Sequence, residues 1–299
     1  LHHRSIFFIR LKKMSNNYYI VCLVVIYKEK IFASGTIRSL LHSFSELKDT
    51  NKKILVKLWD NSPDSQSSTD LNRLKELFLQ NDILLSYQHQ KNNYPLSIVY
   101  NHFFQEFIHQ ARFLMLLDQD SIFGPEYFQE FYNAEKRSNV DLFLPKIMHK
   151  GRIISPTKIY YAKGFYYKEI ASGFISSKKL GAINSGMIIS SKYLIRTRFS
   201  YDIRLGNYCT DDFFMKKFRE NKGIAYILDY SFDHDLTLST LNDNSDSLRR
   251  RYEEMIKGKR LVYSNNIFEM IFIRLYIILN RCYISLKYKD LKYLKGFYE

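Results

Sequence analysis

The chain has 299 residues, 46% of them hydrophobic, which is enough for one large α/β domain or two small ones with a sizeable core. Proline and glycine are scarce, and the absence of any internal repeat, low-complexity tract or flexible linker excludes a repetitive or largely disordered chain. The net charge of +15 points to an anionic partner, such as nucleic acid, a nucleotide substrate or an acidic membrane face.

The three cysteines, Cys22, Cys209 and Cys282, are far apart and form no C-x-x-C pair. This spacing argues against a disulfide framework or a structural zinc site and favours a reduced, cytosolic compartment. The opening LHHRSIFFIRLKK is basic, and its apolar patch is too short for a secretory signal. Because Met14 begins a natural-looking start, we predict that residues 1–13 are a non-native or disordered extension.

Short apolar runs alternate with segments of helical period in the first part of the chain. The unbroken apolar runs predict strands at residues 18–27, 52–60, 82–88 and 112–117. The segments between them predict helices at residues 32–44, 67–80 and 95–110. This order predicts an α/β domain with a doubly wound, Rossmann-like and mostly parallel sheet covered by helices on both faces.

Ligands of such sheets bind outside the carboxyl ends of the strands. The predicted topology therefore places polar residues from distant parts of the sequence along one rim. These residues are Tyr27, Asp60, Asn61, Asp118 and Asp120.

The second half of the chain is less regular. It predicts strands at residues 141–147, 185–190 and 224–232, a helix at 210–221, and a wholly helical, basic region from about Leu248. We expect Ser68, Thr69 or Asp70 to cap the second helix of the chain and Pro95 to open the third.

Asp118 and Asp120 flank Gln119 at the end of the apolar run FLMLL. If the extended conformation continues through them, both carboxylates point to one side of the strand. Two like charges side by side call for a cation, and oxygen ligands suit Mg²⁺ or Mn²⁺. The alternative is a polar turn with a helix cap before GPEYFQEFY. The position of the pair on the rim favours the metal.

A second acidic pair, Asp211 and Asp212, opens the helix predicted in TDDFFMKKFREN. Thr210 or Asp211 could cap that helix, and acids suit the dipole at a helix start. Capping needs only one acid, so the other could project into a cleft as a general base. His234, in SFDHDLT, could complete a metal site, bind a phosphate, or be a solvated loop histidine.

The ordered motifs resemble the GT-A-fold glycosyltransferases of family 2. They are Tyr27 after the first strand, WDNS after the second, DQDS after the fourth, then NSGMIIS, TDDFF and a late histidine. The LLDQDS form is similar to bacterial rhamnosyltransferase-like members. The resemblance spans roughly Tyr18 to His234, and it implies a GT-A catalytic domain at residues 14–245 with a helical, basic extension at residues 246–299.

The resemblance also implies roles for individual residues in binding the donor. Asp60 would contact the nucleobase, and Asp118 would lie near the ribose. Asp120 would hold the metal on the diphosphate, with His234 near the metal or the diphosphate. The other positions assigned to nucleotide-sugar binding are Tyr27, Asn61 and Gly186.

For catalysis, Asp212 resembles the second acid of the family's ED pair, the catalytic base, and Asp211 replaces the usual glutamate. Two positions depart from the family pattern. Lys28 stands where asparagine is common after the first strand, and Tyr94 stands where glycine is expected after the third.

The activity that the resemblance implies is inverting transfer of a sugar from a UDP- or dTDP-sugar, with dTDP-rhamnose as one candidate, using Mg²⁺ or Mn²⁺. The expected acceptor is a glycan or lipid-linked oligosaccharide in bacterial surface polysaccharide synthesis, such as capsule or O-antigen. The expected location is cytoplasmic, on the inner face of the cell membrane.

Three alternatives compete with this interpretation. A HAD-like phosphohydrolase also places D-x-D after an apolar strand, but normally after the first core strand. A nucleotidyltransferase shares the doubly wound sheet, but the sequence has no glycine-rich basic loop near its start. The high positive charge would suit a nucleic-acid-binding protein, yet no recognition motif appears, so we expect no nucleic-acid partner.

The C-terminal run NIFEMIFIRLYIILNRCYISLKYKDLKYLKGFY is basic, aromatic and apolar. Glu269 and Arg274 interrupt it, so it falls short of the roughly 18–20 uninterrupted apolar residues of a membrane-spanning helix. We expect an interfacial segment on an anionic membrane surface. The alternative is a helical hairpin packed on the domain.

Overall fold

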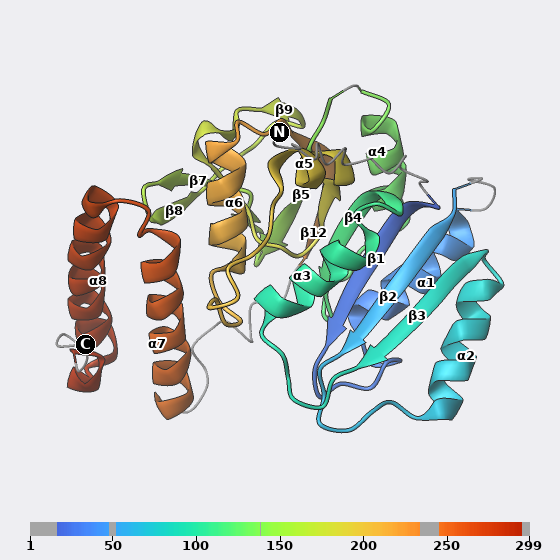
Figure 1. Cartoon of the computed structure of the whole chain (residues 1–299), viewed down its shortest axis with the longest axis horizontal. Helices are drawn as coiled ribbons and strands as arrows, with labels where there is room; N and C mark the ends of the chain where they lie inside the picture. Colours follow the sequence, from blue (N-terminus) through green and yellow to red (C-terminus); the bar gives the residue numbers. More distant parts are fainter. Residues whose placement is uncertain (1–16, 48–51, 138, 234–244, 295–299) are drawn as a thin grey trace, which may run out of the picture.

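The computed structural model describes residues 17–47, 52–137, 139–233 and 245–294. The predicted extension at residues 1–13 and the candidate ligand His234 lie outside the described residues. Figure 1 shows a central twisted sheet with helices on both faces and two C-terminal helices beside it.

The first half of the chain forms four parallel strands that alternate with three helices. The strands are β1 (Tyr18–Ile26), β2 (Ile54–Asp60), β3 (Ile83–His89) and β4 (Ala111–Asp118). The helices are α1 (Gly35–Glu46), α2 (Ser68–Leu79) and α3 (Leu96–Phe107). The four strands lie in the sheet in the order β3-β2-β1-β4. The predicted elements are confirmed, with ends shifted by a few residues at most.

The second half completes the sheet in the order β4-β11-β5-β12. β11 runs antiparallel to both neighbours, whereas β5 and β12 are parallel to each other. The strands are β5 (Leu142–His149), β11 (Met187–Ser190) and β12 (Ala225–Asp233). The helices are α4 (Glu126–Ala134), α5 (Ser191–Thr197) and α6 (Thr210–Glu220). The sheet is therefore mixed but mostly parallel, as predicted.

A further group of short strands between β5 and β11 was not predicted. β6 (Arg152–Ser155) pairs with β5, and β9 (Gly173–Ile175) lies on the edge beside β12. A separate small sheet joins β10 (Leu180–Gly181), β7 (Thr157–Tyr160) and β8 (Lys163–Tyr166), with the 3₁₀ turn η1 (Ser177–Lys179) before β10.

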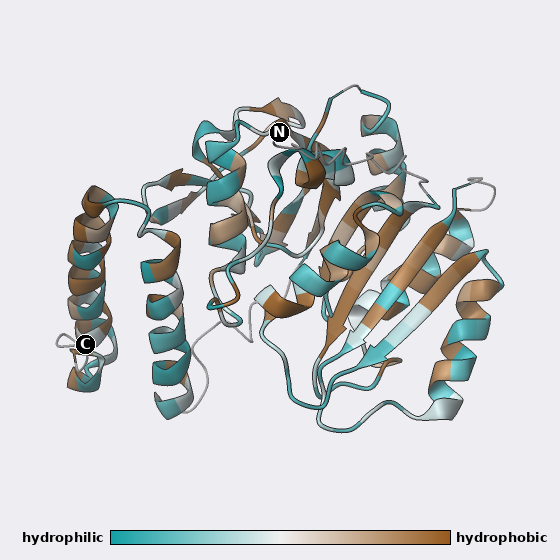
Figure 2. Cartoon of the chain, viewed as in Figure 1, coloured by the Kyte–Doolittle hydropathy of each residue, from teal (hydrophilic) through white to brown (hydrophobic). Residues whose placement is uncertain are grey.

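Two hydrophobic cores cover the two faces of the main sheet. β1 contributes to both, because Val21 and Leu23 pack into one core and Cys22 and Val24 into the other. The helices α1, α2 and α4 cover the Cys22 face, and α3, α5 and α6 cover the Val21 face. Figure 2 shows the strands of the main sheet as the most hydrophobic part of the domain.

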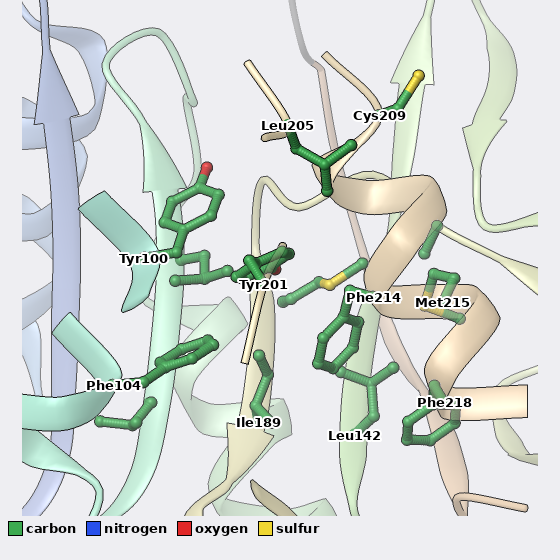
Figure 3. Packing of buried hydrophobic residues seen from close by; sticks show 14 of the residues in the cluster. Tyr100, Phe104, Leu142, Ile189, Tyr201, Leu205, Cys209, Phe214, Met215 and Phe218 are labelled. Carbon is green, nitrogen blue, oxygen red and sulfur yellow. The ribbon is translucent and has the colours of Figure 1, made fainter. Parts of the chain in front are cut away.

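Helix α6 is anchored through its apolar side chains. Phe214, Met215 and Phe218 are buried, and in Figure 3 they pack with Leu142 and Tyr201 beneath the helix. Full burial of such side chains stabilises the fold by roughly 1.5–3 kcal/mol each. The first residue of α6, Thr210, accepts a hydrogen bond from Asn184 near the carboxyl end of β4, so the helix begins at that edge of the sheet.

The predicted cap of α2 is wrong, and the capping alternative considered for α6 does not form. Helix α2 is capped by the Ser67 hydroxyl, which accepts the N–H of Asp70 at 3.1 Å, one residue before the predicted candidates Ser68, Thr69 and Asp70. Helix α6 follows Cys209, which has a left-handed φ of 64° and makes no side-chain cap.

Capping by Thr210 or Asp211 therefore does not explain the acidic pair at the start of α6. The Thr210 hydroxyl accepts a hydrogen bond from Asn184 at 2.9 Å instead. The Asp211 carboxylate accepts the N–H of its neighbour Asp212 at 2.8 Å.

The C-terminal part is helical, as predicted, and comprises α7 (Ser245–Val262), α8 (Ile267–Tyr288) and the 3₁₀ turn η3 (Leu291–Leu294). Within α8, Arg281 is buried and forms two hydrogen bonds of 2.6 Å with Glu253 of α7. Across the described ranges, no helix combines the length and apolarity needed to cross a membrane.

Candidate active site

The rim predicted from the sequence forms at the carboxyl ends of β2, β1 and β4. In the sheet register, Asp60 lies beside Ile26 of β1, and Asp118 lies beside Val25 on the opposite side of β1. With neighbouring strands about 4.8 Å apart, the backbones of Asp60 and Asp118 are about 10 Å from each other. Tyr27 follows β1 between them and is 39% exposed.

Asp60 is fully buried, and its carboxylate is occupied by the protein itself. One oxygen accepts the N–H of Ser62 at 3.0 Å, and the other accepts the Tyr87 hydroxyl at 2.8 Å and the Gln66 amide at 3.3 Å. These bonds fix the loop after β2. A nucleobase could reach Asp60 only by displacing one of these partners.

Asn61 is also buried and internally bonded. Its side-chain oxygen accepts from the Trp59 indole at 3.1 Å and from the Tyr94 N–H at 3.1 Å, and its amide donates to the Tyr94 carbonyl at 2.8 Å. Asn61 therefore ties the loop after β2 to the segment that leads into α3. Asn61 thus positions these two segments at the carboxyl edge of the sheet.

The segment after β4 is a tight turn. The strand ends at Asp118, and Gln119 and Asp120 form the turn, so the alternation expected to point both carboxylates to one side does not apply. The start of α1 holds this turn, because the Thr36 hydroxyl donates to the Asp118 carbonyl and the Ser34 hydroxyl donates to the Gln119 carbonyl.

Gln119 links the turn to β1 as well. Its side-chain oxygen accepts the N–H of Tyr27 at 2.7 Å. The end of β4, the end of β1 and the start of α1 are therefore bonded to one another around the D-x-D turn.

A third carboxylate, Glu29, lies near Asp120. Burial raises the pKa of Glu29, and the charge of Asp120 raises it further, while Arg38 opposes the shift. One Glu29 oxygen is buried and has no hydrogen-bond partner among the described residues. Sequence analysis missed Glu29, although a carboxylate directly after the first strand, in YKEK, was the available signal.

This donor set fits a hard divalent cation. Mg²⁺ uses one or two protein carboxylates and completes its shell with water and substrate phosphates, and the Asp120–Glu29 pair meets that need. In the described part of the chain, no group of three or more histidine, cysteine or acidic side chains gathers around one point. The fit therefore rests on this acidic pair.

A pocket of about 550 Å³ opens beside Glu29. It lies between the segment after β1, which carries Lys28 and Lys30, and the loop after β2. The Lys28 N–H donates to the Ser62 hydroxyl at 2.8 Å, which joins the two walls. The lining also contains Asp64 and Asp70, so its carboxylates outnumber its two lysines, and a nucleoside diphosphate in this pocket would need a divalent cation beside it.

Tyr100 lies between the end of β4, which carries Asp118, and the start of α6, which carries Asp211. This tyrosine of α3 is buried, which raises its pKa, and the charges of Asp118 and Asp211 raise it further. Hydrogen bonds join the two segments, because Asn184 donates to the Thr210 hydroxyl at 2.9 Å and the hydroxyls of Ser121 and Ser185 are bonded at 2.7 Å. The roles assigned to the two acidic pairs stay predictions.

Asp211 and Asp212 have different surroundings within this site. Burial and the neighbouring Asp212 charge raise the pKa of Asp211 from 3.8 to about 7. Asp212 is more accessible and pairs with Lys259 of α7 at 2.8 Å. Lys259 also donates to the Ala162 carbonyl at 3.2 Å. The C-terminal helices therefore contribute a cation to the site, which sequence analysis missed.

Gly186 has a structural explanation. Its φ is +79°, and an added Cβ would lie 2.9 Å from a side-chain carbon of Pro145. Its N–H donates to the Leu116 carbonyl at 2.8 Å, and its own carbonyl accepts the Tyr127 hydroxyl. The glycine lets the chain turn tightly into β11 beside β4.

Comparison with known proteins gives matches by structure alone. No protein-family model and no curated protein sequence matches the chain. The TarS 1–349 structure of S. aureus in complex with UDP superposes with a TM-score of 0.55 at 16% identity, over 93% of this chain and 75% of that one. The same protein in complex with UDP-GlcNAc gives a TM-score of 0.54 at 15% identity, over 93% and 76%.

A second protein, GalNAc-T7 with UDP, GalNAc and Mn²⁺, gives a TM-score of 0.58 at 14% identity. The match covers 94% of this chain and 54% of that chain. The chain has the GT-A glycosyltransferase fold. In this GT-A fold the two acidic pairs lie at the carboxyl edge of the sheet, where open α/β sheets bind their ligands.

Proposed function

We propose that the protein is a glycosyltransferase that uses a nucleoside-diphosphate sugar and a divalent metal ion. One observation carries the proposal: at the carboxyl edge of a GT-A sheet, the turn that follows β4 is hydrogen-bonded through Ser121 and Ser185 to the segment whose Asn184 donates to Thr210, directly before the Asp211–Asp212 pair. The structural neighbours that bind UDP, UDP-GlcNAc or UDP with Mn²⁺ support this function. The GT-A fold favours it over the phosphohydrolase and nucleic-acid-binding alternatives.

In this proposal, Asp120 and Glu29 hold Mg²⁺ or Mn²⁺, and His234 remains a candidate ligand. When bound, the ion would neutralise the charge that develops on the leaving diphosphate. Asp118 would hold the nucleotide near its ribose. Asp60, Asn61, Tyr27 and Gly186 would shape the nucleotide-sugar site.

The Asp211–Asp212 pair would supply the base. Asp212 is the accessible member, so it would take the proton of the acceptor hydroxyl as that oxygen attacks the anomeric carbon from the face opposite the diphosphate. A single displacement of this kind inverts the anomeric configuration. Asp211 lies directly beside Asp212, and burial together with the Asp212 charge raises the pKa of Asp211 to about 7, while Lys259 forms an ion pair with Asp212 at 2.8 Å.

For the donor we propose a UDP- or dTDP-sugar, with dTDP-rhamnose as one candidate, and for the acceptor a glycan or lipid-linked oligosaccharide of a bacterial surface polysaccharide. We place the enzyme in the cytoplasm, peripheral on the inner face of the cell membrane. Helix α8 supports this location, because its outer side exposes large apolar residues next to basic ones.

A panel of UDP- and dTDP-sugars tested with Mn²⁺ or Mg²⁺ by thermal shift addresses the donor. We expect one nucleotide sugar to stabilise the protein, EDTA to abolish the effect, and Glu29→Gln to weaken the metal dependence. Stabilisation that is unaffected by EDTA would remove the metal from the proposal. No stabilisation by any nucleotide sugar, together with no sugar transfer, would refute the proposed function.

A further inference from the structure

A second pocket, of about 590 Å³, lies outside the nucleotide rim, on the far side of the Asp212–Lys259 pair. It is bounded by β7, η1, the second half of α6 and the start of α8. Figure 1 shows these elements grouped at the end of the molecule where the two C-terminal helices lie. The side chains that matter below are Tyr160, Lys178, Lys179, Lys216, Arg219 and Tyr263.

Positive charge in this pocket exceeds negative charge. Four cations and two carboxylates, Glu220 and Glu269, line the pocket. Lys216 pairs with Glu269 at 2.7 Å and lies 3.8 Å from Glu220, so the lining carries two more positive than negative charges. Arg219 donates to the Leu180 carbonyl at 2.8 Å, and neither Lys178 nor Lys179 forms an ion pair with any residue that the structure describes. The pocket therefore attracts an anion.

A buried hydroxyl on the wall of the pocket points independently to a ligand. Tyr263 is only 3% exposed, and the Arg219 guanidinium approaches its hydroxyl oxygen as a donor. In the described part of the chain, the proton of this hydroxyl has no acceptor within hydrogen-bond distance. A buried polar group without a partner costs roughly 1–3 kcal/mol, so a ligand oxygen that accepts this hydroxyl would recover that loss. Tyr160 adds an exposed ring, over which the Lys179 ammonium lies at 4.3 Å.

The pocket lies further along α6 and α7 than the Asp211–Asp212 pair. Lys259 of α7 contacts Asp212 of α6, and one turn further along both helices Lys216 donates to the Val262 carbonyl at 2.8 Å. A helical turn rises about 5.4 Å, so Lys216 lies about that far along α6 from Asp212, and Arg219 lies about 10 Å along it. An acceptor of about two sugar rings bridges that separation.

We propose that this pocket binds a phosphate group carried by the acceptor. Resting on the proposed function, this inference places the acceptor hydroxyl at Asp212 and the phosphate between Lys178, Lys179 and Arg219. Tyr263 donates its hydroxyl to a phosphate oxygen. Phosphate suits the pocket because it brings close to two negative charges and three acceptor oxygens to a lining with an excess of two positive charges and a buried hydroxyl donor.

Binding of glucose 1-phosphate to the full chain, measured by titration calorimetry without donor or metal, tests the pocket. We expect the double variant Lys178→Ala/Lys179→Ala to weaken binding about tenfold or more, and Tyr263→Phe to weaken it several-fold. The matched control is Lys163→Ala/Lys192→Ala, which removes the same charge from exposed positions outside the pocket. Equal affinity for glucose, or equal losses in the control and the pocket variants, would overturn the proposal.

Vesicles of phosphatidylcholine containing phosphatidic acid distinguish a lipid-borne phosphate from a soluble one. If either probe binds in a way that depends on Lys178 and Lys179, the proposal is supported, and the probe that binds shows whether the phosphate is soluble or lipid-borne. If neither probe binds, the proposal is overturned. The donor thermal shift in the same variants separates this inference from the proposed function. We expect the pocket variants to keep the thermal shift that the nucleotide sugar produces. If the parent and all variants lack that thermal shift, the proposed function itself is wrong.

Discussion

The acid pair at the start of α6 combines opposing electrostatic influences within one helical turn. Asp211 is buried next to a like charge, which favours its protonated form. Asp212 forms an ion pair with Lys259 at 2.8 Å. A general base works best when its pKa is near the working pH, and two neighbouring carboxylates of this kind titrate as a coupled pair.

Asp212→Asn should reduce kcat/KM for sugar transfer by about 10²–10⁴, because it removes the proton acceptor while preserving the shape of the side chain. Donor binding in the thermal-shift assay should be unchanged. Asp120→Ala is the comparison variant, and it should lose activity together with metal-dependent donor binding. If Asp212→Asn retains full transferase activity while Asp120→Ala loses it, the assignment of the base is wrong.

Asp211 gives the fold a pH dependence of predictable sign. Its pKa is about 7 in the folded chain and 3.8 as a free side chain, so the folded state binds the proton more tightly. The contribution of Asp211 to stability is thus fully present below about pH 4 and is lost as the pH rises through about 7.

Asp211→Asn should therefore raise Tm relative to the parent more at pH 8 than at pH 5, by on the order of a few °C. The acidic limb of the activity profile should also move to lower pH. Asp82→Asn is a suitable control, because Asp82 is exposed and has a φ of 57° that asparagine tolerates. A Tm difference that is the same at both pH values would contradict the burial argument.

At this residue scale, sequence reasoning located the rim but not every function on it. Asp60 and Asn61 lie where predicted, yet their side chains are hydrogen-bonded to protein groups that are distant in the sequence, such as Tyr87 and Tyr94. Such partners cannot be inferred from one chain without its fold. Lys259 was missed for the same reason, since 47 residues separate it from Asp212.

At the scale of elements, the predictable parts are those with unbroken burial. β1, β2 and β4 are buried on both faces, so their sequences are continuous apolar runs. β8 is exposed at all four positions, and β7 exposes two of four. Strands this short and solvent-exposed have no periodic hydrophobic pattern in their sequences. The small sheet that forms part of the second pocket was therefore not predicted.

The turn into β11 offers a test of structure against ligand binding at Gly186. Gly186→Ala should lower the free energy of unfolding by roughly 1–3 kcal/mol, because its φ is +79° and the new methyl would meet Pro145 and Phe232. Urea denaturation measures this loss. Gly206→Ala is the matched control, since nothing lies within 4 Å of the methyl it would add.

If Gly186→Ala leaves stability unchanged and instead weakens the affinity for the nucleotide sugar, the glycine contacts the donor directly. Equal destabilisation by both glycine variants would show that local flexibility, and not the crowded turn, sets the loss.

At the scale of the whole molecule, the C-terminal helices contact the candidate active site on one side and expose an apolar surface to solvent on the other. Helix α7 delivers Lys259 to the acid pair, and α8 packs outside it through a narrow stripe. The rest of α8 exposes a broad apolar surface, coloured brown in Figure 2, with Arg274, Lys287 and Lys289 also exposed. An apolar face flanked by cations suits an anionic bilayer surface, and docking there would hold the second pocket close to lipid-linked acceptors.

Leu279→Glu tests this arrangement, because Leu279 is 71% exposed on α8 and its loss should not disturb the core. We expect the variant to pellet with vesicles containing anionic lipid several-fold less than the parent, since a carboxylate replaces a leucine that would enter the interface and also repels the lipid charge. The matched control is Leu79→Glu, which makes the same change at a leucine 57% exposed on α2. If both variants pellet like the parent, α8 is not the membrane contact, and if both lose binding equally, net charge and not the helix face governs it.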